Sequence, residues 1–321
     1  KIKFYLKIHH EILQEDQWPL VYHDDYNVSF GGLEKLHAFD AKKWHCLVRP
    51  LEAQKSDLLA VHTPKYLKKL KWSVHVAGIA EVPLMAFVPN PLVQCAYLKP
   101  MRLQTGGSVL AGKLALERGW AINVGGGFHH CSGKRGGGFC PYADITLLVH
   151  TLVENNLIQN CMIVDLDAHQ GNGYQHDFLG KPEVYIMDMY NKNIYPRDEA
   201  AKRAIRRRVE LTHHIEDLEY MLKLRNLKAA LEEFKPDILV YNAGTDILNN
   251  DPLGHMRISD VGIVKRDQFV FEMCKEHRIP VVMLTSGGYL PVTARIIANS
   301  IINLHTKGLI TGTIDTAITE K

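Results

Sequence analysis

The sequence lacks the features of a disulfide-stabilised, zinc-finger or membrane-spanning protein. Its six cysteines are scattered and form no C-x-x-C pair, which argues against a structural zinc of the finger type and against a disulfide framework. The most apolar long stretch, residues 74–93, contains Glu81 and three prolines, so it does not offer the roughly 20 mostly apolar residues of a membrane span. Residues 1–10 mix polar and apolar side chains without a small-residue cleavage site, so we expect no secretory signal. We therefore expect a soluble, intracellular protein with reduced thiols.

The sequence also lacks a strong excess of charge of one sign. It contains 38 Lys and Arg against 35 Asp and Glu, and its net charge is +3. A nucleic-acid-binding domain normally carries a strongly basic face or tail, so we expect no direct binding of nucleic acid. Hydrophobic residues make up 46% of the chain, which excludes a disordered or collagen-like protein. Because no repeat, linker or charge block divides the sequence, we predict one domain over residues 1–321.

Short apolar runs that stop at glycines or acidic residues recur along the chain. Four such runs occupy residues 120–124, 161–165, 237–242 and 279–285. They are rich in β-branched residues and do not alternate with polar residues, which is typical of strands covered on both faces in a parallel sheet. Helical patterns lie at residues 145–155, 217–233, 259–277 and 291–305. The alternation predicts a doubly wound α/β domain, in which ligands bind at the carboxyl ends of the strands.

The first candidate site residues lie at the end of the apolar run 161–165 and just after it. Asp165, Asp167 and His169 alternate along an extended segment, so their side chains would point to the same side. Two carboxylates and an imidazole repel one another unless a cation or a hydrogen-bond network neutralises them. Oxygen and nitrogen ligands of this kind suit zinc, iron or manganese. Taken alone, the pattern is explained equally well by a strand end with solvated acids.

Asp246 follows another of the apolar runs. Together with Asp167 and His169 it would complete a set of three ligands, and a catalytic zinc has three protein ligands and one open position. By itself, Asp246 is better explained as a helix cap or turn residue.

Two further groups could supply proton transfer and oxyanion stabilisation. His129 and His130 follow three glycines at the end of the first run, and histidine can act as base or acid because its pKa lies near neutrality. Tyr289 follows Ser286, Gly287 and Gly288 at the end of the last run, where its hydroxyl could donate to a developing oxyanion. A packing tyrosine on a turn is the simpler reading of that motif in isolation.

Four segments in this order resemble the zinc-dependent histone deacetylases, and most closely their class IV branch. They are residues 123–145, 164–173, 241–248 and 285–289, and the likeness continues in the flanking residues 31–40, 104–107 and 262–267. It covers nearly the whole chain. The resemblance implies a single three-layer α/β/α domain with a central, mostly parallel, eight-stranded sheet of the arginase and deacetylase type.

The resemblance also implies roles for the residues described above. It places one zinc ion on Asp167, His169 and Asp246, and it gives Tyr289 the task of assisting the substrate carbonyl. His130 resembles the general base and His129 its electrostatic partner and possible acid, whereas Asp165 would orient His129 and bind a structural potassium ion. Asn172 stands where many relatives have an aspartate behind the second histidine. The walls of a substrate tunnel would be formed by Gly138, Phe139, Tyr195, Leu253 and Gly287.

The function implied is metal-assisted hydrolysis of N-acyl-lysine in histone or non-histone proteins, in the nucleus and cytoplasm and in connection with chromatin and transcription. Removal of long fatty-acyl chains is a further expectation from the class IV likeness, and protein complexes are possible. Two alternatives remain open. One is a binuclear manganese ureohydrolase of the same fold, although Gly171 and Thr245 offer no bridging carboxylates. The other is a catalytically weak protein that binds acyl-lysine or serves as a scaffold. The segment 44–56 is short for the class.

Overall fold

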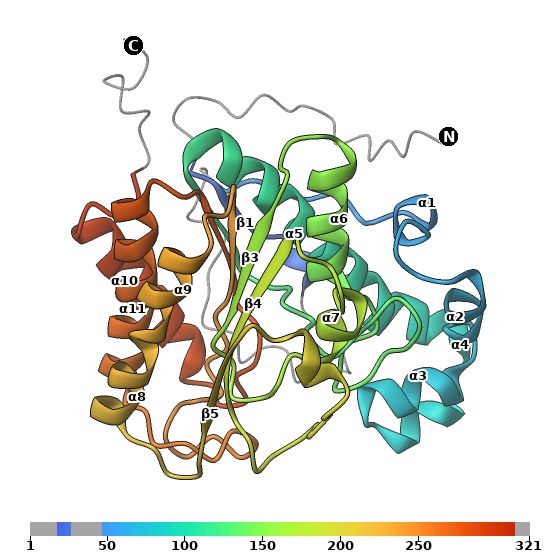
Figure 1. The fold of residues 1–321 in the computed structure, drawn as a ribbon. Coiled ribbons are helices and arrows are strands. Elements are labelled where there is room, and N and C mark those ends of the chain that lie inside the picture. The colour runs from blue at the N-terminus through green and yellow to red at the C-terminus, as the bar shows by residue number, and fades with distance from the viewer. Residues whose placement is uncertain (1–17, 27–46, 312–321) are drawn as a thin grey trace.

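The computed structural model describes residues 18–26 and 47–311 of the chain. Residues 31–40, which contribute to the resemblance, and the first part of the short segment 44–56 lie outside the described residues. Figure 1 shows a central sheet with helices packed against both of its faces. This arrangement agrees with the α/β fold that the alternating pattern of the sequence predicts.

The sheet contains seven strands in the part of the chain that the structure describes, and all of them are parallel. Their bounds are β1 (Leu20–Val21), β2 (Trp120–Asn123), β3 (Cys161–Asp165), β4 (Val184–Asn191), β5 (Arg207–Leu211), β6 (Leu239–Asn242) and β7 (Val281–Leu284). Their order across the sheet is β1-β2-β7-β6-β3-β4-β5. The four predicted strands are β2, β3, β6 and β7, which lie side by side in the sheet, and every residue in them is buried.

The expectation of eight strands is corrected to seven for the described residues. That number came from the resemblance and not from the apolar runs. The sheet ends at β5, where the exposed Arg208 and Glu210 alternate with the buried Val209 and Leu211. Exposed charged side chains of this kind are typical of an edge strand, because they discourage pairing with a further strand.

Two hydrophobic cores flank the sheet, because successive side chains of a strand point to opposite faces. In β3, Ile163 contributes to one core, whereas Met162 and Val164 contribute to the other. The first core contains residues of α5 (Lys99–Arg118), α6 (Asp144–Glu154) and α7 (Asn172–Asp177). The second contains residues of α8 (Asp217–Leu224), α9 (Asn226–Glu233), α10 (Asp260–His277) and α11 (Thr293–Thr306). The single helix predicted over residues 217–233 is therefore two helices, which meet at Arg225.

Shorter helices precede α5 and lie at the right of Figure 1. They are α1 (Lys55–Leu58), α2 (Pro64–Lys69), α3 (Ser73–Ala80) and α4 (Asn90–Val93), followed by the π-helical turn η5 (Gln94–Leu98). Three 3₁₀ turns complete the described structure, η1 (Asp24–Tyr26), η4 (Pro83–Phe87) and η6 (Ala201–Ala204). No helix among the described residues is long and apolar enough to cross a membrane.

The order of the strands determines where the candidate residues meet. His129 and His130 follow β2, and Tyr289 follows β7. Asp246 follows β6, and Asp167 and His169 follow β3. These four strands are adjacent in the sheet. Because carboxyl ends of parallel strands lie at one edge of a sheet, these loops converge although they are far apart in the sequence.

Candidate functional site

Asp167, His169 and Asp246 come together at this edge. Each offers one ligand atom, the three atoms lie within 4.8 Å of one another, and all three residues are buried. Nδ1 of His169 lies 2.7 Å from Oδ2 of Asp246 and 3.2 Å from Oδ1 of Asp167. The structure thus places three side chains from two adjacent strand ends around one point.

The charges of this cluster show what it is suited to hold. Burial lowers the pKa of His169, but hydrogen bonds to Asp167 and Asp246 outweigh it and raise that pKa to about 10. Burial and the charge of Asp167 raise the pKa of Asp246 to about 7. A proton on His169 therefore bridges two buried carboxylates that would otherwise repel. Two carboxylate oxygens and an imidazole nitrogen are also a ligand set that zinc accepts, with a further position left for water or substrate, so the residues fit that ion.

Hydrogen bonds from neighbouring loops hold the carboxylates of Asp167 and Asp246 in place. Oδ2 of Asp167 accepts hydrogen bonds from the backbone N–H of Gly287 and the hydroxyl of Ser286, both at 3.1 Å. Oδ1 of Asp246 accepts one from the N–H of Ala168 at 2.9 Å. A Cβ atom on Gly287 would lie 2.5 Å from Oδ2 of Asp167, so the loop approaches this closely only because residue 287 is glycine.

The two histidines have different partners. Nδ1 of His129 lies 2.9 Å from Oδ2 of Asp165, and Nδ1 of His130 lies 2.9 Å from Oδ1 of Asn172. Burial lowers the pKa of His129, but the charges of Asp167 and Asp165 outweigh it and raise that pKa to about 9. Burial, with the charges of His129 and His169, lowers the pKa of His130 well below its ordinary value. The pair therefore combines a ring that holds its proton with one that is neutral at physiological pH.

The amide of Asn172 has a second contact that fixes its orientation. Its Nδ2 donates to Oδ2 of Asp198 at 3.4 Å, so its oxygen faces Nδ1 of His130. That ring nitrogen then donates, and Nε2 remains the proton acceptor of His130. Asp198 also pairs with His176 at 2.7 Å and with Arg135 at 3.1 Å, which connects this histidine to the surface of the protein.

Tyr289 lines a cavity of about 250 Å³ together with the His129–His130 pair and Asp167. Burial and the charges of Asp167 and Asp246 raise the pKa of its phenol, which therefore stays neutral and able to donate a proton. The ring of Tyr289 lies 5.9 Å from that of Phe139, and its backbone N–H donates to Asp251 at 3.0 Å.

The predicted tunnel residues divide into two groups. Gly138, Phe139 and Gly287 line the cavity, and a Cβ on Gly138 would lie 2.4 Å from the ring of His130. Tyr195 and Leu253 are not among the lining residues. Tyr195 nevertheless stacks edge-on against His130, with ring centroids 4.9 Å apart. Leu253 donates its backbone N–H to Asp251, the same carboxylate that accepts from Tyr289.

Several buried polar residues of the site were not predicted. Asp144 accepts hydrogen bonds from the N–H groups of Gly127 and Phe128, both at 2.8 Å, and so shapes the loop that carries His129. Asp188 lies in register with Asp165 on the next strand, and burial and the charge of Asp165 raise its pKa well above the ordinary value. Asp188 could have been predicted, because it is an acidic residue within the apolar run that forms β4. No feature of the local sequence distinguishes Asp144.

Similarity to known proteins identifies the family of this chain. Residues 30–304 match the sequence profile of the family described as "Histone deacetylase domain". The chain belongs to the histone deacetylase family. It is 51% identical over 307 residues to histone deacetylase 2 of Arabidopsis thaliana, covering 91% of this chain and 79% of that protein.

More distant members of the histone deacetylase family match as well. Histone deacetylase 1 of Homo sapiens is 27% identical over 258 residues, which cover 76% of this chain and 52% of that protein. The crystal structure of a histone deacetylase homologue complexed with SAHA superposes with a TM-score of 0.69 at 21% identity, over 91% of this chain and 84% of that one. The solved structure supports the assignment of the fold.

Proposed function

We propose that this chain is a zinc-dependent hydrolase that removes acyl groups from the ε-amino group of lysine in proteins. The observation that carries the proposal is the convergence of Asp167, His169 and Asp246 beside two histidines with opposite pKa shifts. Pairs of titratable groups whose surroundings drive their pKa values apart are typical of acid–base catalysis. Family membership and the names of the relatives support the same reaction.

Asp167, His169 and Asp246 would hold the ion, which supplies activation of a water molecule and polarisation of the acyl carbonyl. The proton of that water passes to Nε2 of His130, which is free to accept it because Nδ1 is engaged with Asn172. His129 retains its proton beside Asp165. It therefore stabilises negative charge that develops in the cavity, and it can supply a proton to the departing lysine amine.

Tyr289 donates its hydroxyl to the oxygen of the acyl group as that oxygen becomes negative. Its phenol stays neutral because burial and two nearby carboxylates disfavour the phenolate. An uncharged donor aimed at a developing oxyanion is one of the larger single contributions to catalysis. Tyr289 is 40% exposed, so its side chain can reach substrate from the wall of the cavity.

We further propose that a structural potassium ion lies near Asp165. Oδ1 of Asp188, on the neighbouring strand, is buried and makes no hydrogen bond to any described residue. Two adjacent buried acids with an unpaired oxygen fit a cation.

We also propose that the chain belongs to the class IV branch of the family. We propose that it acts on histone or non-histone proteins in the nucleus and cytoplasm, and that it works within protein complexes.

A second cavity supports activity on long acyl chains. It measures about 290 Å³ and shares Gln104, Thr285, Ser286 and Gly288 with the cavity that contains Tyr289. Apolar side chains including Val124, Ala294, Ile297 and Ile301 contribute to its lining. We propose that a hydrocarbon chain attached to the scissile carbonyl continues past these shared residues from the first cavity into the second.

Turnover of peptide substrates tests this function and its acyl preference together. The zinc-loaded chain is expected to hydrolyse acyl-lysine peptides, with a kcat/KM for myristoyl-lysine at least about tenfold above that for acetyl-lysine, because burial of each methylene contributes about 0.8 kcal/mol. Metal content is measured on the chain as purified, and formation of the deacylated peptide is measured on the zinc-loaded chain. Two manganese ions per chain would indicate the ureohydrolase, and zinc binding without turnover of any acyl-lysine peptide would indicate a reader or scaffold.

Replacing Asn172 by Asp should change the pH profile rather than abolish activity. A carboxylate next to Nδ1 raises the pKa of His130, and the base must be deprotonated to act. The acidic limb of kcat/KM is therefore expected to move to higher pH by about one unit. Because Asp198 lies next to this position, the double variant with Asp198→Asn removes the added repulsion, and Asp198→Asn alone serves as control. An unchanged acidic limb in the double variant would contradict the role of His130.

A further inference from the structure

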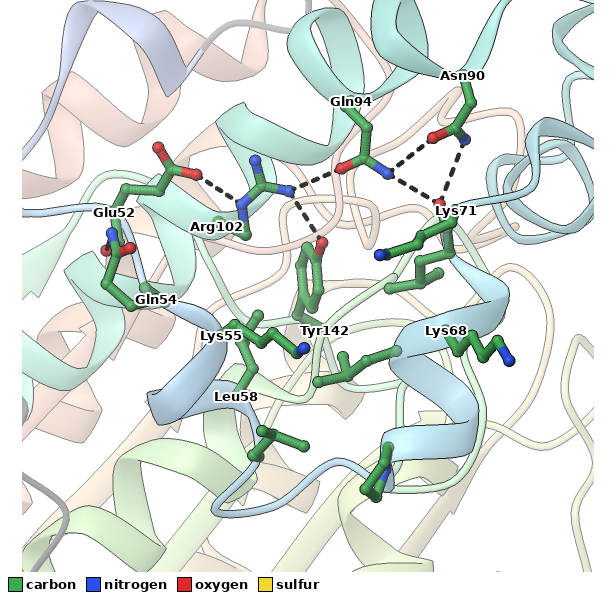
Figure 2. A pocket seen from close by; sticks show the side chains of 15 residues that line it. Glu52, Gln54, Lys55, Leu58, Lys68, Lys71, Asn90, Gln94, Arg102 and Tyr142 are labelled. Atoms are coloured by element: carbon green, nitrogen blue, oxygen red, sulfur yellow. Dashed lines mark hydrogen bonds and ion pairs between the residues drawn. The ribbon is translucent and has the colours of Figure 1, made fainter.

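A cavity of about 720 Å³ lies between the short helices α1 and α2, the turn η5 and the long helix α5. It shares no lining residue with either cavity described above. Its volume falls within the range of about 300–1,000 Å³ that is usual for small-molecule sites. Figure 2 shows this cavity with its lining side chains.

One wall of the cavity is polar and held by a network of hydrogen bonds. Arg102 donates from Nε to Glu52 at 2.6 Å, and from Nη1 to the hydroxyl of Tyr142 at 3.2 Å and to Gln94 at 3.3 Å. Gln94 in turn donates to the backbone oxygen of Leu70 at 2.9 Å. The carboxylate of Glu52 balances the charge of Arg102, so this wall is rigid and close to neutral.

The opposite side is apolar and carries unpaired positive charge at its rim. Its apolar lining residues are Leu58, Leu59, Pro64, Leu67 and Leu70. Figure 2 shows the ammonium groups of Lys55 and Lys71 directed toward the cavity from two sides, whereas that of Lys68 points away. Neither Lys55 nor Lys71 forms a side-chain hydrogen bond or ion pair with any residue that the structure describes.

We propose that this cavity binds an amphiphilic anion, a small molecule with a carboxylate or phosphate headgroup on a hydrocarbon body. The headgroup lies between Lys55 and Lys71, whose ammonium groups are directed toward the cavity from two sides and would each pair with it. The hydrocarbon body packs against Leu59, Pro64 and Leu67, the lining residues that keep exposed apolar surface. Tight binding requires both the headgroup and the hydrocarbon body. An inorganic anion makes no contact with the apolar lining residues, and a neutral alcohol forms no ion pair with the lysines. The proposal is independent of the catalytic function.

Calorimetric titration of the whole chain with four probes tests the ligand chemistry. Octyl phosphate and octanoate carry the two headgroups, octanol carries the chain without a charge, and inorganic phosphate carries the charge without a chain. At least one of the two octyl anions is expected to bind at least about tenfold more tightly than octanol and inorganic phosphate, since each buried methylene contributes about fourfold in affinity. The ratio between the two octyl anions identifies the headgroup. Equal binding of octanol, or no binding of either anion, overturns the proposal.

Matched lysine variants test the location. The double variant Lys55→Met and Lys71→Met keeps much of the aliphatic stem but removes both charges, and it should weaken binding of the preferred anion about tenfold. Lys68→Met removes a charge from α2, close to Lys71 in sequence but with its ammonium group facing away, and it should change binding less than about twofold. All three lysines are exposed, so the variants should keep the melting temperature of the parent. Unchanged binding in the double variant, or an equal loss in Lys68→Met, contradicts this site.

Discussion

Replacing Asp246 by Asn should lower kcat/KM by at least about 10³-fold and remove high-affinity zinc binding, because one of three protein ligands loses its charge. The amide can still accept the hydrogen bond from Ala168 through its oxygen, so the loop should keep its shape. The effect is measured as zinc affinity by competition with a chelator and as turnover on an acyl-lysine peptide. Asp260→Asn, an exposed carboxylate at the start of α10, is the control and should change neither quantity.

The same variant should make the metal-free protein more stable at neutral pH. Folding raises the pKa of Asp246 from its ordinary value of 3.8 to about 7, so the ionised carboxylate is disfavoured in the folded state. The stability lost by the parent accumulates as the pH rises from about 4 to about 7. The advantage of Asp246→Asn in melting temperature should follow the same course. A variant that loses both zinc binding and stability at pH 8 would contradict this account of the carboxylate pair.

Replacing Tyr289 by Phe should lower kcat about 10²–10³-fold while zinc affinity and melting temperature stay close to those of the parent. The loss falls on kcat because the hydroxyl acts on charge that develops only during the reaction. The phenol makes no hydrogen bond to any residue that the structure describes, and the backbone N–H of Tyr289, which donates to Asp251, is unaffected.

Tyr195→Phe is the matched control for this experiment. Tyr195 is 48% exposed and its ring lies 4.9 Å from that of His130, so it tests the loss of a phenolic hydroxyl close to the same histidine. Its removal should change kcat less than about tenfold, since this residue is not assigned a contact with the oxyanion. Equal losses in the two variants would contradict the specific role of Tyr289, as would undiminished turnover in Tyr289→Phe.

The sequence predicts the centre of the sheet better than its edges. β2, β3, β6 and β7 are fully buried, and burial on both faces selects the uninterrupted apolar runs that make strands recognisable. β1 spans only Leu20–Val21, too few residues for a pattern, and β5 contains Arg and Glu because one side faces solvent. The interruption between α8 and α9 at Arg225 contains no Gly or Pro, so local sequence gave no sign of it.

The candidate site was predicted unevenly for a physical reason. Residues whose side chains approach the central point, such as Asp167, His169 and Asp246, belong to short motifs next to strand ends and can be read from the sequence. Residues that support them from elsewhere, such as Asp144 and Asp198, depend on contacts between segments that only the folded chain brings together. Their positions carry no local pattern that distinguishes them from ordinary acidic residues.

The place of β7 in the sheet has a consequence for synthesis of the protein on the ribosome. Among the seven strands that the structure describes, β7 is the last to be synthesised, yet it lies between β2 and β6. Strands β3 to β6 can pair before it emerges, but β1 and β2 have no bridge to them until Val281–Leu284 has left the exit tunnel. Pairing of β7 with both neighbours therefore completes the sheet that brings the histidine pair after β2 to the acidic residues after β3 and β6.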